Sequence, residues 1–317
     1  MTSTLVREAG AGGAGAPPAP GRPARRRGHG RGRVPYLFVV PALLIYGLVV
    51  LYPTVAGGIF AFTDWSGQRA APTFIGLDNF VTLFTTESSR AALFNTLTIA
   101  LACTIVQTVI GLALATALNT RLRSRNVLRT LFFAPALLPP VIIGFLWQYI
   151  LTPTGPLNTA LDAIGLGFLS QNWLGDSSVA LGSVIAVIIW QNAGLTMVIY
   201  LAGLQGVPQE LYEAASIDGA GAWQRFRSVT LPLLIPATTI ALSLTLIGSL
   251  KLFDQVFAMT GGGPGYATET LSVIMYKEAF VSGRFGYSAA IALVLAMIVF
   301  AFAMIQLKAL RRFEVDA

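Results

Sequence analysis

The sequence predicts an all-α, polytopic membrane protein with six transmembrane helices. Of its 317 residues, 55% are hydrophobic and only 11% are charged, whereas a soluble domain typically carries about a quarter charged residues. The few charges are separated by long charge-free stretches, and these lack the apolar–polar alternation of outer-membrane β-strands. Such a chain must face lipid, where a helix satisfies every backbone N–H and C=O internally.

Six charge-free stretches are each long enough to cross a bilayer, because about 20 apolar residues in a helix span the ~30 Å hydrocarbon layer. They are 34–63, 91–120, 130–161, 177–209, 228–250 and 285–307, and together they form one predicted domain, 34–310. The first stretch follows a basic segment, as a signal peptide would. It is about twice as long as a signal h-region of about 7 to 15 apolar residues, so we count it as a span.

The distribution of Lys and Arg predicts that both termini are cytoplasmic. With six spans, segments 1–33, 119–130, 206–230 and 308–317 share one side, and they hold 16 of the 21 basic residues. The tail 1–33 is rich in Ala, Gly, Pro and Arg and is too poor in large apolar side chains to fold. We expect it to be a disordered cytoplasmic tail near anionic lipid, with a second, short tail at 311–317.

The composition also excludes several classes of function. A single cysteine, Cys103, rules out an intramolecular disulfide, and a single histidine, His29, rules out paired-His zinc motifs. No lysine follows a glycine, so the core of a P-loop is absent and nucleotide energy would have to come from a partner. The spans offer no base for a membrane-embedded enzyme. The Arg-rich tail has no aromatic residues between its arginines, which argues against nucleic-acid binding.

The loop between the fourth and fifth spans predicts two short helices around a glycine turn. Pro208 suits a first helical position, and Gly219 can adopt the left-handed conformation that closes a helix. Trp223 and Phe226 are three residues apart and therefore share a face of the second helix. A bare loop would be enough to join two spans, so this helix pair predicts a docking surface for a soluble partner.

This loop resembles the EAA signature of permease subunits in binding-protein-dependent ABC importers. The matching residues are Glu213, Ala214, Ala215, Asp218, Gly219, Ala220, Leu231 and Pro232, with Val229 where the pattern usually has Ile. The longer form EAAxxDGA resembles the sugar-importer branch related to the maltose and glycerol-3-phosphate permeases. The resemblance extends from about Tyr36 to the C-terminus.

The resemblance implies the fold of an ABC importer permease and a set of partners. In such importers the EAA loop forms a coupling helix in a cleft of an ATPase, and closure of two ATPases rocks two permeases between outward and inward states. The chain is then expected to be one permease of a heterodimer in a bacterial inner membrane, served by an extracytoplasmic binding protein for a sugar, polyol or sugar phosphate. ATP and Mg²⁺ would be used by the ATPases, while this chain would bind no cofactor and catalyse no reaction. The expected coupling residues are Glu213, Ala214, Ala215, Asp218, Gly219, Trp223, Leu231 and Pro232.

Neutral polar and aromatic side chains in the third and fourth spans predict a path for a sugar. Asn192, Thr196 and Tyr200 recur every four residues and so share a helix face, and Trp147 and Gln148 could converge on the same cavity. Sugar hydroxyls need neutral donors and acceptors, and aromatic rings pack on the apolar faces of pyranoses. The alternative is that these side chains only join helices or belong to an interfacial belt.

A glycine-rich segment, 260–268, follows the fifth span on the expected extracytoplasmic side. Its three successive glycines predict a flexible loop. Gly261, Gly262, Gly263, Pro264 and Gly265 could form a simple turn, but glycine also lets a backbone approach another molecule closely. Because related permeases use a loop here to reach the binding protein, we favour a contact with that protein.

An ion-coupled secondary transporter is the alternative function. Such carriers commonly place Asp, Glu, His or Arg within the membrane, because a proton or cation must bind there. All six spans are free of charge, which argues against proton coupling. Sodium coupling through backbone carbonyls stays open, and the sequence does not name the sugar.

Overall fold

The computed structural model describes residues 39–67, 71–120 and 123–311, so the predicted tail 1–33 and all but the first residue of the predicted tail 311–317 lie outside the described residues. The chain divides into a unit that ends at Val50 and a second unit that begins at Leu51. The described part of the first unit consists of α1 (Val40–Tyr46) and most of the π-helix η2 (Gly47–Leu51). The second unit contains the remaining elements and all the sites described below.

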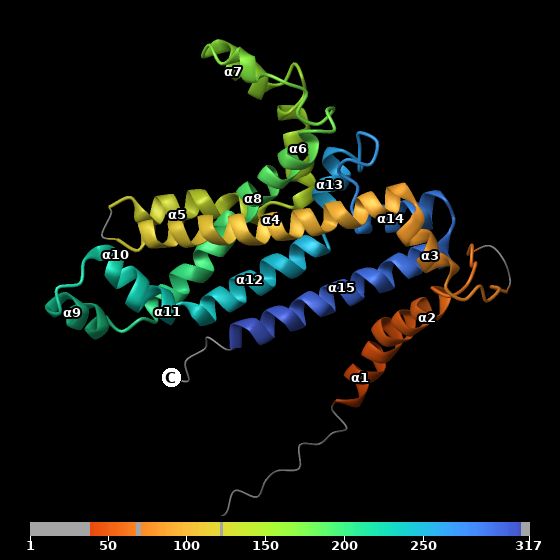
Figure 1. Cartoon of the computed structure of the whole chain (residues 1–317), viewed down its shortest axis with the longest axis horizontal. Helices are drawn as coiled ribbons and strands as arrows, with labels where there is room; N and C mark the ends of the chain where they lie inside the picture. Colours follow the sequence, from red (N-terminus) through yellow and green to blue (C-terminus); the bar gives the residue numbers. More distant parts are fainter. Residues whose placement is uncertain (1–38, 68–70, 121–122, 312–317) are drawn as a thin grey trace, which may run out of the picture. The chain divides into compact units, whose positions relative to one another are not determined.

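Four helices of the described segments are long and apolar enough to cross a membrane. They are Val40–Phe60, which ends with α2 (Tyr52–Phe60), together with α4 (Glu87–Leu118), α8 (Ala180–Gln205) and α15 (Phe285–Arg311). In the apolar window of α8, 61% of the residues are buried, against 33% in α4 and 28% in α15. Helix α8 is therefore the most enclosed of the long helices in the second unit (Figure 1).

The third predicted span is bent, which corrects the prediction of a single straight helix. It consists of α5 (Arg125–Phe133), the 3₁₀ turn η3 (Ala134–Leu137) and α6 (Pro140–Ile150), and its two arms meet at 97°. Proline removes an N–H donor and disfavours the α conformation in the residue before it. Consecutive prolines at 139 and 140 thus hold Leu138 extended, with ψ of 141°, and α6 leaves the bundle steeply (Figure 1).

The fifth predicted span is also broken. It begins within a helical segment made of α10 (Ala222–Arg225), the π-helix η5 (Phe226–Thr230) and α11 (Leu231–Leu233), and it continues as α12 (Ile235–Leu250) after a bend of 67° at Leu234. Pro236 lies in the first turn of α12 and has no N–H to donate to a carbonyl of the preceding turn. The described residues therefore hold four continuous candidate spans, or up to six when each bent pair counts as one.

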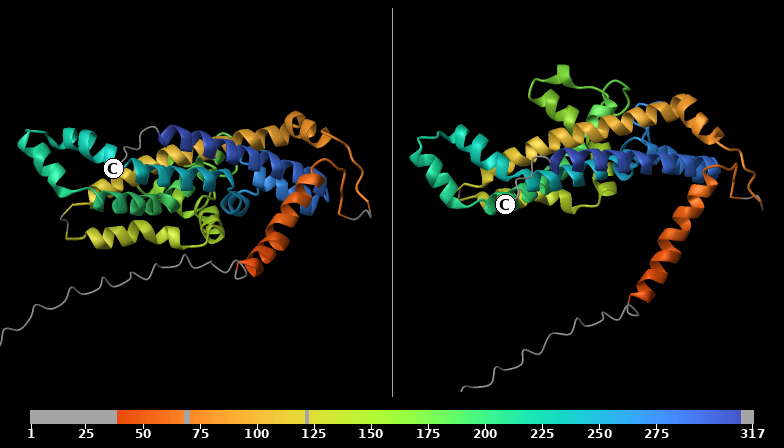
Figure 2. Two further views of the ribbon diagram at one scale, coloured as in Figure 1. Left: turned by 90° about the horizontal axis from the view of Figure 1, so that it is seen from below. Right: turned by 60° about the horizontal axis from the view of Figure 1, so that its bottom comes forward.

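Short helices flank the long ones. They are α3 (Asp78–Thr85), α7 (Pro156–Ala163), η4 (Gly167–Leu169), α9 (Gln209–Ile217), α13 (Asp254–Met259), α14 (Leu271–Tyr276) and the π-helix η6 (Lys277–Val281). Helices α9 and α10 lie at one end of the α4, α8, α12 and α15 bundle, and α3 and α14 lie at the other (Figures 1 and 2). The only β-contact within the described residues is an isolated bridge between Thr63 and Phe74.

The core forms where α4 and α8 pack closely. A Cβ added to Gly111 of α4 would come within 2.6 Å of Thr196 on α8, so only glycine permits this approach. Cys103 is completely buried among Ile99, Val184 and other apolar residues. Cys103 thus behaves as a small apolar core residue.

Candidate functional site

The loop between α8 and α12 folds as the predicted pair of short helices around a glycine turn. Helix α9 ends in a Schellman motif, in which Ala220 N donates to Ala215 O at 2.9 Å and Gly219 N donates to Ser216 O at 3.1 Å. Gly219 has a φ of +77°, in the left-handed region. A Cβ added there would meet nothing within 4 Å, so the backbone conformation, rather than lack of space, favours glycine.

The two helices expose an apolar patch with acidic residues beside it. Ile217 is 87% exposed and Trp223 is 72% exposed. The Trp223 ring stacks on Phe226 with 5.6 Å between centroids, as their spacing predicts. Glu213 and Asp218 are exposed as well. We call the exposed side chains of α9 and α10 the coupling surface, because a soluble partner would find here the apolar area that docking needs.

A hydrogen bond closes the helix pair into a hairpin. The hydroxyl groups of Tyr212 on α9 and Thr230 at the end of η5 are 2.9 Å apart, and Thr230 is buried. The hairpin continues through Leu231 and Pro232, both exposed, to the bend at Leu234. A bend of 67° at Leu234 separates the hairpin from α12.

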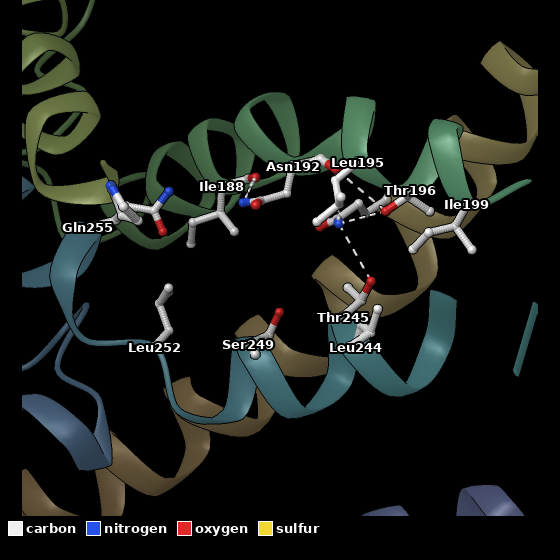
Figure 3. A pocket seen from close by; sticks show the side chains of 13 residues that line it. Ile188, Asn192, Leu195, Thr196, Ile199, Leu244, Thr245, Ser249, Leu252 and Gln255 are labelled. Atoms are coloured by element: carbon white, nitrogen blue, oxygen red, sulfur yellow. Dashed lines mark hydrogen bonds between the residues drawn. The ribbon is translucent and has the colours of Figure 1, made fainter. Parts of the chain in front are cut away.

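A cavity of about 180 Å³ lies between α4, α8 and α12, and most of its lining is apolar; we call it the polar cavity after the neutral polar side chains that also line it. Figure 3 shows Asn192 and Thr196 on α8 across the cavity from Thr245 and Ser249 on α12. Gln107 of α4 connects these helices, because its Nε2 donates to Thr196 Oγ1 at 2.9 Å and lies 3.5 Å from Thr245 Oγ1. The lining offers neutral donors and acceptors and no charged group.

Tyr200 does not join this cavity. It is completely buried and packs with Leu201, Leu204 and Leu234. A four-residue spacing advances 40° beyond a full turn of an α-helix, so two steps from Asn192 rotate Tyr200 by about 80°. Of the predicted stripe, Asn192 and Thr196 line the cavity and Tyr200 does not.

Trp147 and Gln148 also lie away from the polar cavity, contrary to the predicted convergence. Trp147 lines a separate cavity of about 600 Å³ with Trp173 and Trp190, and its ring is 5.3 Å from that of Trp190. Gln148 lines a third cavity, of about 380 Å³, with Gly263 of the glycine-rich loop. Neighbouring residues on a helix point about 100° apart, and the 97° bend turns α6 away from the bundle.

Four polar residues of the cavity escaped the sequence analysis. They are Gln107, Thr245, Ser249 and Gln255. Gln107 was detectable, because it is the single Gln of the second predicted span. Gln255 lies beyond the fifth predicted span, and only the fold brings it to the cavity, where its Nε2 donates to Gln191 Oε1. Gln191 in turn donates to Leu138 O at 3.0 Å, at the bend of the third span.

The glycine-rich loop after α13 forms hydrogen bonds of its own. Gly261, Gly262 and Gly265 have φ of +60°, +96° and +59°. The Thr268 hydroxyl donates to Gly263 O at 2.7 Å, and Thr268 N donates to Gly262 O at 3.3 Å. The glycines thus serve a tight turn with left-handed residues.

Helix α4 holds the segment that follows this turn. Asn95 Nδ2 donates to Tyr266 O at 2.9 Å and to Glu269 O at 3.0 Å. Leu271 N donates to Thr96 Oγ1 at 2.9 Å. Both Asn95 and Thr96 are buried, so these bonds form away from solvent.

Two ion pairs lie at the same end of the bundle. Lys277 Nζ is 2.6 Å from Glu269 Oε1, and the Glu269 side chain is only 3% exposed. Arg284 is 2.6 Å from Glu278 Oε2. The hydrogen bond to Glu278 raises the pKa of Arg284, because it favours the charged guanidinium.

Comparison with known proteins relates these features to transporters. A family described as "Binding-protein-dependent transport system inner membrane component" matches residues 107–313. The probable starch degradation products transport system permease protein AmyD of Thermoanaerobacterium thermosulfurigenes is 37% identical over 281 residues, which cover 89% of this chain and 95% of that relative. The multiple sugar-binding transport system permease protein MsmF of Streptococcus mutans serotype c is 34% identical over 280 residues, which cover 88% and 96%.

A solved structure shares the fold over most of the chain. It is a bacterial alginate ABC transporter in complex with alginate pentasaccharide-bound periplasmic protein. One of its chains gives a TM-score of 0.76 at 25% identity, with 87% of this chain and 93% of that chain covered.

Proposed function

The chain belongs to the family of binding-protein-dependent transport system inner membrane components, and from this premise we propose that it is the sugar-translocating permease subunit of an ATP-driven importer. It is a multi-pass inner-membrane protein, and the ion-coupled transporter is no longer the favoured alternative. Two features of the same helical bundle carry the proposal. The first is the exposed hairpin of α9 and α10, which the hydrogen bond between Tyr212 and Thr230 closes, and the second is the neutral cavity inside the bundle. The hairpin receives the movement of a partner, and the cavity suits an uncharged solute.

The coupling surface is the proposed contact with an ATPase subunit. ATP and Mg²⁺ bind to the two ATPases, while this chain binds no cofactor and catalyses no reaction. Glu213, Ala214 and Ala215 lie on the contacting helix α9, and Asp218 follows at its C-terminal end. Gly219 sets the angle of this helix, and Trp223 supplies apolar area beside Ile217. Leu231 and Pro232 then pass the movement to the fifth span. A hairpin with a closed turn transmits a displacement that a floppy loop would absorb.

The polar cavity is the proposed part of the sugar path in this subunit. Asn192, Thr196 and Gln107 present amide and hydroxyl groups, which can both donate to and accept from sugar hydroxyls. The relatives' names refer to starch degradation products and multiple sugars, and the structural neighbour is an alginate importer. We infer that the substrate class is a sugar or short oligosaccharide. Trp147 and Gln148 line separate cavities outside this path.

The remaining partners follow from the two ends of the bundle. We place both termini and the coupling surface in the cytoplasm, as the distribution of basic residues predicts. The glycine-rich loop, Gly261 to Gly265 with Pro264, then faces the extracytoplasmic side and meets the sugar-loaded binding protein. A second, homologous permease completes the pore against this chain, which places the neutral cavity beside the pore.

Reconstitution tests this proposal. The permease is purified together with a partner permease and an ATPase and placed in proteoliposomes that contain ATP. Uptake of labelled sugar is then measured with the binding protein outside. We expect uptake that requires both ATP and the binding protein and that persists when ionophores collapse ion gradients. Uptake without ATP that stops with an ionophore would instead support the ion-coupled transporter.

A further inference from the structure

We propose that Asn95, Thr96, Glu269 and Lys277 form a loop clasp, a set of positioning residues that holds the glycine-rich loop in the shape in which it meets the binding protein. The inference rests on the proposed function, because it assumes that this loop contacts the binding protein. It adds residues that neither the EAA signature nor the predicted loop includes. None of the four needs to touch the partner.

The clasp fixes the segment directly after the turn from two sides. On one side, both hydrogen bonds from Asn95 Nδ2 end on backbone carbonyls, those of Tyr266 and Glu269, at 2.9 and 3.0 Å. On the other side, Lys277 at the start of η6 pairs with the buried Glu269 carboxylate at 2.6 Å. The segment is therefore held to α4 and to η6 at once.

The face that this arrangement presents is open. A Cβ added to Gly261 or Gly265 would meet nothing within 4 Å, and the Tyr266 side chain is 47% exposed. Three residues of the clasp are instead buried beneath the loop: Asn95 is 6% exposed, Thr96 is 1% exposed and Glu269 is 2% exposed, whereas the Lys277 side chain is 38% exposed. The clasp thus supports the loop from inside and leaves its outer face free for a partner.

Such support matters because a loop that is ordered before docking loses less conformational entropy when it docks. A turn with three left-handed glycines has many other conformations available in the free state. The clasp selects one of them. We therefore expect it to act on the affinity for the binding protein, and to leave the rate of the ATPase at saturation unchanged.

Helix α4 also connects the clasp with the sugar path. Asn95 and Gln107 lie on the same helix, about 18 Å apart along its axis at 1.5 Å per residue. Gln107 lines the polar cavity. A binding protein seated on the loop would thus bear on the helix that supplies a cavity side chain. This connection explains why the loop is held by α4 as well as by its own turn.

The test measures ATP hydrolysis by the reconstituted complex as a function of binding-protein concentration. We expect Asn95→Ala to raise the half-saturating concentration about 5- to 30-fold, since two buried hydrogen bonds are lost, with little change in maximal rate. Thr104→Val is the matched control. It removes a buried α4 hydroxyl that has no hydrogen-bond partner among the described residues, and it should leave the titration unchanged.

The ion pair supplies an independent comparison. Lys277→Met leaves the Glu269 carboxylate buried without its partner, and it should impair half-saturation more than the double variant Glu269→Gln with Lys277→Met. This difference between the single and the double variant is expected only if Lys277 acts through Glu269. If Lys277 instead contacted the binding protein at the surface, the two variants would be equally impaired. The comparison of the ion-pair variants can still be made if the complex with Asn95→Ala fails to assemble.

The outcomes distinguish the two proposals. If the binding protein does not stimulate the wild-type complex, the proposed function fails and the clasp fails with it. If the wild type is stimulated but Asn95→Ala and both ion-pair variants titrate like the wild type, only the clasp is wrong. A fall in maximal rate at unchanged half-saturation would also contradict it, because that pattern indicates general damage to the permease.

Discussion

Replacing Gly219 by valine should disconnect ATP hydrolysis from sugar movement while the permease stays in the membrane. The residue closes α9 with φ of +77°, and two Schellman hydrogen bonds depend on that conformation. Valine is β-branched and strongly disfavours positive φ. Because an added Cβ meets nothing within 4 Å, the penalty comes from the backbone alone and acts on the angle between α9 and α10.

The magnitude follows from this conformation. A non-glycine residue forced into the left-handed region costs roughly 1 to 3 kcal/mol. At 25 °C this range corresponds to about a 5- to 150-fold lower population of the native turn. We expect binding-protein-stimulated ATP hydrolysis and sugar uptake to fall by a similar factor, because only the native turn presents Ile217 and Trp223 together.

The assay combines co-purification of the ATPase subunits with hydrolysis and uptake in proteoliposomes. Two controls isolate the backbone effect. Gly219→Asn should retain most of the coupling, since Asn tolerates positive φ. Gly221→Val makes the same substitution two residues later, where φ is −67° and an added Cβ again meets nothing. Gly221→Val should therefore reduce stimulated ATP hydrolysis and sugar uptake far less than Gly219→Val does.

The reasoning is refuted if Gly219→Val shows wild-type stimulation and uptake. It is also refuted if Gly221→Val is as damaging as Gly219→Val, because steric bulk in the turn, rather than the sign of φ, would then decide the outcome.

Two further predictions concern topology and the sugar path. In a variant that lacks Cys103, an impermeant maleimide applied to intact cells should label a cysteine at Ser177 and not one at Ser216. Both positions are exposed in the structure. Strong labelling at Ser216 would show that the orientation assigned to the chain is inverted. Thr196→Val should lower the transport efficiency kcat/KM about 2- to 10-fold through loss of a cavity hydroxyl, whereas Tyr200→Phe, in the core one turn later, should leave sugar selectivity unchanged. Equal effects of these two variants in uptake assays would argue that Thr196 only packs helices.

Hydropathy identified the spans because their length and lack of charge follow directly from the thickness of the bilayer. It missed the bends, because Pro135, Pro139 and Pro140 count as ordinary neutral residues in a hydropathy window. The prolines were nevertheless visible in the sequence, and their effect on the preceding residue predicts an interruption. A span that contains such a cluster should therefore be treated as a candidate for two helices.

The coupling turn was the most predictable feature, since its determinants are local. Gly219 closes α9 through bonds to residues within five positions of it. The cavity was less predictable, because it depends on how α4, α8 and α12 pack. Asn192 and Thr196 were identified from spacing, but Gln107 comes from a different helix. The loop clasp joins Asn95 to Glu269 across 174 positions, which no periodicity reveals.

The central claim is that the coupling surface contacts the ATPase, and site-specific photo-crosslinking tests it most directly. A photoreactive amino acid is placed at Ile217, which is 87% exposed, or at Phe168, which is 80% exposed but lies between α7 and α8, outside the hairpin. In the assembled, active complex, the label at Ile217 should crosslink to the ATPase subunit, and the label at Phe168 should not. An active complex in which Ile217 fails to crosslink to the ATPase, or in which Phe168 crosslinks to it instead, would contradict the account.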